Sequence, residues 1–346
     1  MKAKLTIAIF FAVLLPLLFS SCDNREQGNN PGQSVSSIYV VKTDGSDQKE
    51  IANGGWGKYT FLPNSNKILY TSFTHDYSSG IPGGTLEYYG LYIINPDGSG
   101  NRPLLVNDHK INWISASPDN KKVLISAGDG IYVLDAEGEI TIRQIQASLQ
   151  DIRKAYFSMD MTKIAFQQKY DVNIMDASGS NIKTIKKAND TTSYLFAGFA
   201  FDDSALVYIE KHKSDSLYHF NTYSLKSGTE TKYNYGEYLF SESEPFYALN
   251  DGTVLYKYGH DIRVFNLVNF WLASRVIAKV DSFSLSNDKK KVIYLGEGGG
   301  RTIYTINIDG TDNKAFYSDK TKSLNIGGPV LSSDGQYLIF SGWRIE

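Results

Sequence analysis

Residues 116–135 read ASPDNKKVLISAGDGIYVLD, and this stretch decides the fold. It opens with a Ser-Pro-Asp-Asn turn and continues into the apolar triplet Val123–Ile125. After a short polar connection it reaches a second apolar run, Ile131–Leu134. Pro, Asp and Asn favour tight turns, and short apolar runs rich in β-branched residues favour strands. The stretch therefore predicts two neighbouring antiparallel strands that follow a tight turn.

The combination of turn and triplet recurs along the chain. An acidic or amide residue is followed by three mostly polar residues and an apolar triplet, and an aromatic residue closes six of the seven triplets. The pattern begins at Asn64, Asp119, Asp160, Asp202, Asn250, Asp288 and Asp334, at intervals of 38 to 55 residues. Self-similarity near this period is typical of four-stranded propeller blades.

A second kind of strand follows each triplet except the last, and several of these strands run into an Asp-Gly turn. Asp97-Gly98 and Asp309-Gly310 are the clearest examples, and an Asp-Gly pair between two strands is a strong hairpin signal. These aspartates do not have the spacing of a Ca²⁺-binding loop. Turn formation therefore explains them.

The two ends of the chain complete each other. Ile38–Val41, followed by Asp44-Gly45, is a strand of the second kind with no triplet before it, whereas the triplet Leu338–Phe340 has no such strand after it. We therefore predict that the N-terminal strands complete the last blade, which leaves only short, protected sheet edges. The predicted fold class is an all-β propeller of seven four-stranded blades closed by N-terminal strands, with six blades as the alternative.

The first 22 residues predict an export signal rather than a folded element. Two lysines precede the apolar run Leu5–Phe19, which is shorter than the roughly 20 residues of a membrane-spanning helix. Residues 19–22, FSSC, resemble the bacterial lipoprotein box and contain the only cysteine of the chain. This resemblance implies lipidation at Cys22. The alternative is an ordinary signal peptide in which the cysteine has no role.

Three segments follow from these patterns: a signal peptide with its lipidation cysteine (1–22), a flexible tether (23–37) and one propeller domain (38–346). The tether is polar and lacks apolar periodicity, so it cannot bury enough surface to fold. We expect a lipid-anchored monomer of the cell envelope, on the periplasmic side of the outer membrane or on the cell surface. Lysine and arginine total 35 and aspartate and glutamate total 37, which argues against a nucleic-acid partner.

The repeat resembles a known family. Residues 92–99, YIINPDGS, and 116–123, ASPDNKKV, are similar to the WD40-like propeller repeat of the TolB family, and the resemblance runs from Ile38 to the C-terminus. It implies a propeller fold and a binding role. TolB itself has six blades and a separate N-terminal α/β domain, whereas this sequence predicts seven blades and a tether. The resemblance therefore does not imply a role in the Tol system, since a fold does not fix a function.

The sequence offers no constellation that predicts catalysis. It has no G-x-S-x-G nucleophile elbow, and the glycine-rich residues 296–300 are not followed by the Lys-Ser/Thr of a phosphate loop. We therefore interpret the propeller as a non-enzymatic binding or scaffold module for a protein, peptide or glycan, with no cofactor and no metal site. The alternative is a polysaccharide-active enzyme such as an oligogalacturonate-lyase-like lyase, whose repeats are similar.

Candidate ligand-binding residues come from the histidines and from one insertion. Four of the five histidines map to one face of the predicted propeller, in the connections after the triplets or between blades. The longest insertion, residues 73–89, lies in the same class of connection and has the glycines and proline of a binding loop. The candidates are His75, Tyr77, Tyr88, Tyr89, His109, Tyr258 and His260. For the adjacent pair of tyrosines, the start of the next strand is an equal alternative. We interpret Trp56 and Trp113 as core residues between blades.

Overall fold

The computed structural model describes residues 36–344 apart from short gaps at 54–56, 77–85, 108–109, 137–140, 148, 215–217, 238–245, 269–273, 278–279, 287–288, 297–300 and 320–323. The regular structure of these described residues consists of 28 strands. Residues 35–346 form one compact unit. Within the described ranges no helix is long and apolar enough to cross a membrane.

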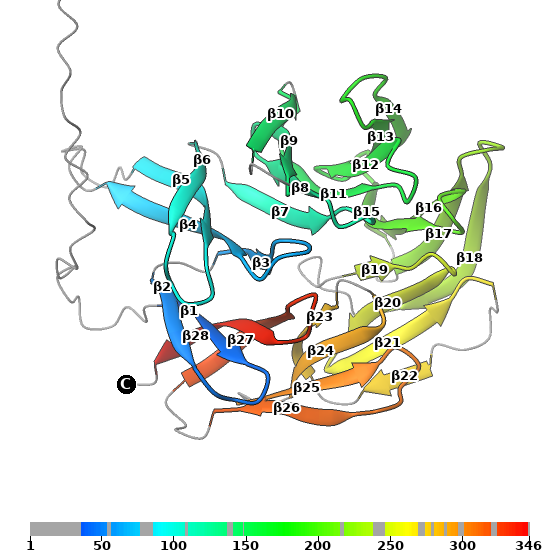
Figure 1. The fold of residues 1–346 in the computed structure, drawn as a ribbon. Coiled ribbons are helices and arrows are strands. Elements are labelled where there is room, and N and C mark those ends of the chain that lie inside the picture. The colour runs from blue at the N-terminus through cyan, green and yellow to red at the C-terminus, as the bar shows by residue number, and fades with distance from the viewer. Residues whose placement is uncertain are drawn as a thin grey trace, which may run out of the picture. The chain divides into compact units, whose positions relative to one another are not determined.

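The strands form seven four-stranded antiparallel sheets, each of which is one blade (Figure 1). Blade 1 consists of β27, β28, β1 and β2, and blades 2 to 7 take the remaining strands four at a time in chain order. The first strands of blades 1 to 7 are β27 (Leu324–Leu331), β3 (Tyr59–Phe61), β7 (Ile111–Ala116), β11 (Ile152–Phe157), β15 (Thr192–Ala200), β19 (Phe246–Ala248) and β23 (Val280–Leu285). This arrangement confirms the prediction of a seven-bladed propeller.

The other strands of each blade follow outward in order. The second strands are β28 (Tyr337–Arg344), β4 (Ile68–Asp76), β8 (Lys122–Ala127), β12 (Lys163–Gln168), β16 (Ala205–His212), β20 (Thr253–Tyr258) and β24 (Lys291–Gly296). The third strands are β1 (Ser36–Lys42), β5 (Leu86–Ile94), β9 (Gly130–Asp135), β13 (Asp171–Asp176), β17 (Tyr218–Ser224), β21 (Asp261–Asn266) and β25 (Thr302–Asn307). The fourth strands are β2 (Lys49–Asn53), β6 (Arg102–Asn107), β10 (Thr141–Gln146), β14 (Lys183–Lys186), β18 (Glu230–Glu237), β22 (Ser274–Ile277) and β26 (Lys314–Ser318).

Blade 1 unites the two ends of the propeller. Strand β1 pairs with β28 in an unbroken register from Ser36 opposite Trp343 to Lys42 opposite Tyr337. The Tyr39 ring stacks on the Phe340 ring, with centroids 5.7 Å apart. The predicted closure of the ring by N-terminal strands is therefore confirmed.

Serine and aspartate in the repeated turns fix the hairpin between the first and second strands. The Ser117 hydroxyl donates to Asp119 Oδ1 at 2.6 Å and accepts the Lys122 N–H at 2.9 Å. Asn120 adopts a left-handed φ of 57°, which asparagine tolerates better than most residues. Ser158 with Asp160, and Ser332 with Asp334, make the same hydroxyl–carboxylate bond. The repeated polar residues are therefore turn-forming groups.

The Asp-Gly turns use their carboxylates in the same way. Asp97 Oδ1 accepts the Ser99 N–H at 2.8 Å, and Asp309 Oδ1 accepts the Thr311 N–H at 2.9 Å. Hydrogen bonds from Ser99 hold the pKa of the Asp97 carboxyl below its usual range. Turn formation accounts for these aspartates, as the sequence predicts.

The core lies between neighbouring blades. The aromatic residues that close the triplets are buried, and Phe166, Tyr208, Tyr256 and Phe340 are fully so. One cluster packs Tyr208 of blade 5 against Val172 of blade 4. The repeated aromatic residue is therefore a packing device, which explains its recurrence in blade after blade.

The insertion at 73–89 is more regular than its composition predicts. Strands β4 and β5 stay paired as far as Asp76 opposite Leu86, so both flanks of the insertion are strand and not loop. Extending the ladder satisfies backbone groups that a loop would leave to solvent. Residues 77–85, the central part of the insertion, lie outside the described residues.

Candidate functional site

The first strands of all seven blades line a central cavity of about 280 Å³. Its lining continues into Pro118, Asn250 and Lys289, which belong to turns between first and second strands. A wider hollow of about 760 Å³ shares these three residues and extends over Asp309. The cavity therefore opens on the face that carries the turns.

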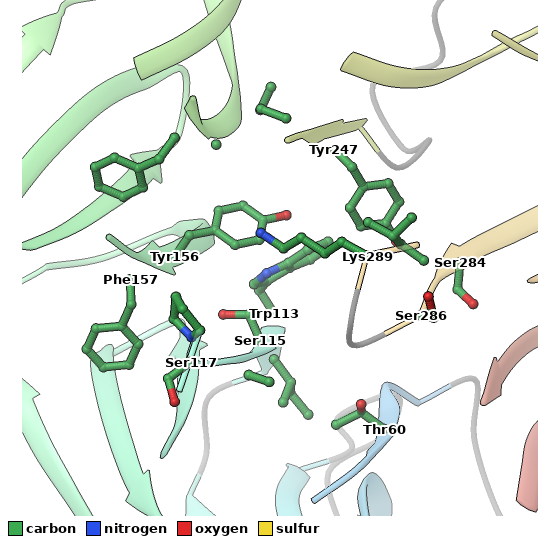
Figure 2. A pocket seen from close by; sticks show the side chains of 18 of the residues that line it. Thr60, Trp113, Ser115, Ser117, Tyr156, Phe157, Tyr247, Ser284, Ser286 and Lys289 are labelled. Carbon is green, nitrogen blue, oxygen red and sulfur yellow. The ribbon is translucent and has the colours of Figure 1, made fainter. Parts of the chain in front are cut away.

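Aromatic side chains form much of the wall (Figure 2). Trp113 of β7 meets Tyr156 of β11 edge to face, with ring centroids 5.7 Å apart, and Tyr247 of β19 lines the same cavity. The interpretation of Trp113 as a core residue between blades is wrong, because its half-buried side chain faces the cavity. A bulge in the pairing of β7 with β8 falls between Ile111 and Trp113, and bulges re-aim neighbouring side chains.

Lys154 belongs to β11, the strand that carries the cavity-lining Tyr156. The two are separated by one residue of β11 and therefore share a side of the strand. A bulge between Ile152 and Lys154 repeats the bulge of β7. The Lys154 ammonium lies 5.4 Å from the centroid of the Trp113 ring and 5.2 Å from that of Phe246. Burial, together with the charge of Lys58, lowers the pKa of Lys154 to about 8.

Two further lysines and one carboxylate belong to the cavity. Lys58 precedes β3 and Lys289 lies in the turn after β23, and burial lowers the pKa of both. The Asp203 carboxylate partly opposes this shift at Lys289, and its Oδ2 accepts the Asp160 N–H at 3.0 Å. Among the described residues that line the cavity, the two lysines outnumber the one aspartate, so the local potential is positive.

The tyrosines of the wall stay protonated at neutral pH. Burial raises the pKa of Tyr247 to about 12, and burial with the nearby Tyr247 raises the pKa of Tyr156 well above its usual value. The Tyr156 hydroxyl and the Trp113 indole Nε1 are both buried, and neither has a hydrogen-bond partner in the structure. Both donors are therefore enclosed within the wall of the cavity.

The ligand-binding residues predicted from the sequence fall elsewhere. His75 belongs to β4, and Tyr88 and Tyr89 belong to β5, as the strand alternative for the two tyrosines predicts. Tyr77 and His109 lie outside the described residues.

The other two predicted residues belong to blade 6. Tyr258 is half-buried, with the Arg263 guanidinium 3.7 Å from its ring centroid. His260 is exposed, and its carbonyl accepts the Val280 N–H at 2.6 Å. Two blades separate blade 6 from the His75 strand in blade 2 along the shorter way round the ring. The role of Tyr258, His260 and His75 in ligand binding remains a prediction.

The sequence gives only a weak indication of the residues around the channel. Strand β11 reads IRKAYF, in which a lysine and a tyrosine alternate with the buried Ala155 and Phe157. A lysine at an inner position of a first strand is the one signal that could have indicated the channel. The described residues contain no group of three or more histidine, cysteine, aspartate or glutamate side chains placed to hold a metal ion.

The class of protein that this architecture defines is a seven-bladed β-propeller. No family model and no curated protein matches the sequence. Solved structures with a similar fold include a putative TolB from Agrobacterium tumefaciens (TM-score 0.51, 12% identity, 91% of this chain and 100% of that chain). They also include an oligogalacturonate lyase from Vibrio parahaemolyticus (TM-score 0.55, 11% identity, 90% and 98%). At these identities the likeness establishes the fold alone, a β-propeller like those of these two proteins.

Proposed function

We propose that this chain is a non-enzymatic lipoprotein of the cell envelope whose propeller binds a ligand in its central channel. The observation that carries the proposal is the convergence of seven blades on one cavity that has aromatic walls. Ligand sites are typically concave and largely apolar, with a few polar groups that set orientation. A volume of about 280 Å³ suits one ring or the end of a chain rather than a folded domain.

Two tyrosines of blade 6 provide a matched test. Tyr247 lines the cavity, whereas Tyr258 lies near the opposite face, in the strand that leads to His260. A ligand is first identified from a glycan array or a pull-down, and each tyrosine is then replaced with alanine. We expect Tyr247→Ala to weaken binding at least tenfold and Tyr258→Ala to leave it unchanged. The reverse result, or crosslinks that cluster around His75 and His260, would place the site on the histidine-bearing face.

Membrane attachment rests on Cys22, which lies outside the described residues. We expect the exported protein to start at this residue, to carry lipid there and to enter the detergent phase, since stable anchoring needs two acyl chains or an equivalent second signal. Mass spectrometry of the N-terminus gives the lipid directly. A Cys22→Ala variant that partitions into detergent as the wild type does would contradict lipid anchoring.

The alternative function is a polysaccharide lyase. It is supported by a likeness of fold to the oligogalacturonate lyase, and a fold accommodates many chemistries. Incubation with pectic oligosaccharides, with and without added divalent metal ions, tests it through the unsaturated product that a lyase releases. We expect no product, and enzyme-dependent product formation would replace the binding proposal with the lyase.

A further inference from the structure

The seven turns between first and second strands can be compared with one another, because they share one backbone hydrogen bond. In each turn the N–H of the fourth residue donates to the carbonyl of the first, as Asn120 does to Ser117. Six of the seven turns have a proline or a polar residue at the second position, which suits a tight turn. The turn of blade 4 has a methionine instead. The second residues are Pro63, Pro118, Met159, Asp202, Asn250, Asn287 and Ser333.

Turn formation does not explain Met159. The residue is 45% exposed, and only three other large hydrophobic residues are exposed in the described part of the chain. These three are Val106, Ile182 and Val268, and none of them lines the cavity or the wider hollow, whereas Met159 lines both. Ligand pockets are lined mainly by apolar side chains, and methionine adapts its shape to different partners. Met159 therefore has the position and the chemistry of a ligand contact.

Lys289 is a second departure from the turn pattern. It is the fourth residue of its turn and has a left-handed φ of 56°, whereas Asn120, Gly252 and Gly335 occupy the corresponding left-handed position in blades 3, 6 and 1. Glycine and asparagine tolerate this conformation better than other residues. Met161 of blade 4 also adopts it, but Met161 packs against the core between blades 3 and 4. Packing explains that methionine, whereas Lys289 is exposed.

Both departures lie where the two hollows meet. Pro118, Met159, Asn250 and Lys289 line the cavity and also the wider hollow, and we call the boundary that they form the neck. The Lys289 side chain points into the cavity (Figure 2). Burial lowers its pKa although the residue is exposed, so its ammonium lies in a hollow that solvent can enter. No described carboxylate is within ion-pair distance of it, and the nearby Asp203 affects its pKa through charge alone.

We infer that the neck binds an apolar acid with one negative charge, whose hydrocarbon part contacts Met159 and the aromatic wall and whose carboxylate meets Lys289. This inference rests on the proposed function, because it takes the channel as the ligand site. Hydrogen bonds between an ammonium and a carboxylate are strong. Asp203 in the cavity, and Asp251 and Asp309 in the wider hollow, disfavour a ligand with several negative charges.

The hydrocarbon part of this acid is a ring or a short chain. The cavity beyond the neck has a volume of about 280 Å³ and is lined by Trp113, Tyr156 and Tyr247. Aromatic side chains stack on rings in offset or edge-to-face arrangements that a chain cannot use. We therefore expect an aromatic acid to bind more tightly than an aliphatic acid of similar size.

The experiment is a calorimetric titration of the full chain in detergent, with titrations into detergent alone subtracted. Phenylacetate is compared with phenylethanol, and hexanoate with hexanol, so that each pair differs in its charged group. The variants are Met159→Ser and Lys289→Asn, which introduce residues that other blades have at these positions. The matched controls are Ile182→Ser and Lys183→Asn, at exposed residues that line neither hollow.

We expect phenylacetate to bind more tightly than phenylethanol. Lys289→Asn should weaken phenylacetate binding roughly tenfold, as loss of a hydrogen bond to a charged group predicts, and should leave phenylethanol binding unchanged. Met159→Ser should weaken the binding of both compounds roughly fivefold, because it removes apolar contact area. The two controls should bind as the wild type does. Neither Met159→Ser nor Lys289→Asn should lower the melting temperature, because serine and asparagine suit the turn.

Three results would overturn the inference: equal affinity for phenylacetate and phenylethanol, phenylacetate binding that survives Lys289→Asn, or no binding of either compound. Tighter binding of hexanoate than of phenylacetate would keep the anion site and replace the ring with a chain.

The inference fails separately from the proposed function. Channel binding would still stand if a ligand captured on a glycan array or in a pull-down loses affinity in Tyr247→Ala. If that captured ligand is indifferent to Tyr247→Ala as well, the channel is not the ligand site and both proposals fall.

Discussion

Removal of strands β1 and β2, residues 36–53, should prevent the propeller from forming a stable closed ring. The deletion takes away the four buried hydrophobic side chains of β1, which are Ile38, Tyr39, Val40 and Val41. At roughly 1.5–3 kcal/mol for each buried side chain, the loss is about 6–12 kcal/mol. A typical domain has a total stability of about 5–15 kcal/mol, so we expect the deletion variant to be unfolded or aggregated at 25 °C.

A rearranged chain supplies the matched control. Because Ser36 pairs with Trp343, the start of β1 lies beside the end of β28. A permuted variant that carries residues 36–53 behind residue 346, joined by a short hairpin loop, should therefore rebuild blade 1 from the same residues. Circular dichroism during heating and gel filtration compare the three proteins. We expect the permuted variant to recover most of the melting temperature of the wild type.

The reasoning would be refuted by either of two results. A deletion variant that melts at the temperature of the wild type would mean that β1 and β2 contribute nothing to the ring. A permuted variant no more stable than the deletion variant would mean that pairing with β28 does not explain their contribution.

Two further predictions concern stability. Gly179→Ala should destabilise the fold by more than Gly310→Ala. Both glycines have left-handed φ values, 94° and 87°. A Cβ added at Gly179 would lie 2.1 Å from the Ile145 carbonyl oxygen of blade 3, whereas a Cβ added at Gly310 would have nothing within 4 Å. In urea denaturation, Gly310→Ala should lower the free energy of unfolding by about 1–2 kcal/mol, the cost of the backbone conformation alone. Equal losses for the two variants would contradict the clash at Gly179. Lys154→Met should be more stable than the wild type at pH 7, and this advantage should shrink as the pH rises from about 8 towards 10.5. In that range the unfolded wild type binds more protons than the folded one, so the stability of the wild type rises with pH. If the difference in stability between Lys154→Met and the wild type does not change with pH, Lys154 is not desolvated.

The sequence was sufficient to predict the fold because its information is local. The serine of Ser117-Pro118-Asp119 and the aspartate of Asp97-Gly98 fix turns through contacts within five residues. The closing aromatic residues mark the second strand of six of the seven blades. Ring closure could also be predicted, because the strand Ile38–Val41 has no triplet before it and the triplet Leu338–Phe340 has no such strand after it.

The channel could not be predicted in the same way. Trp113 and Lys154 lie on neighbouring blades, and their approach depends on how β7 and β11 meet at the centre. The bulges that aim both side chains leave no mark in residue type, because they arise from pairing with β8 and β12. The insertion at 73–89 was predicted as a loop from its glycines, but the ladder between β4 and β5 continues well into it.

The pairing of β1 with β28 also has a consequence for biosynthesis. Ser36 leaves the ribosome long before its partner Trp343 does. The entropic cost of closing so long a segment grows only slowly with its length. The long separation therefore delays the pairing of β1 with β28 but adds little to its free-energy cost. Until β28 has been made, β1 can pair with β2 but lacks its partner on the other side. A chain that stops before β28, or loses β28 to a protease, cannot complete blade 1. Ring closure thus tests whether the strands from both ends of the propeller are present.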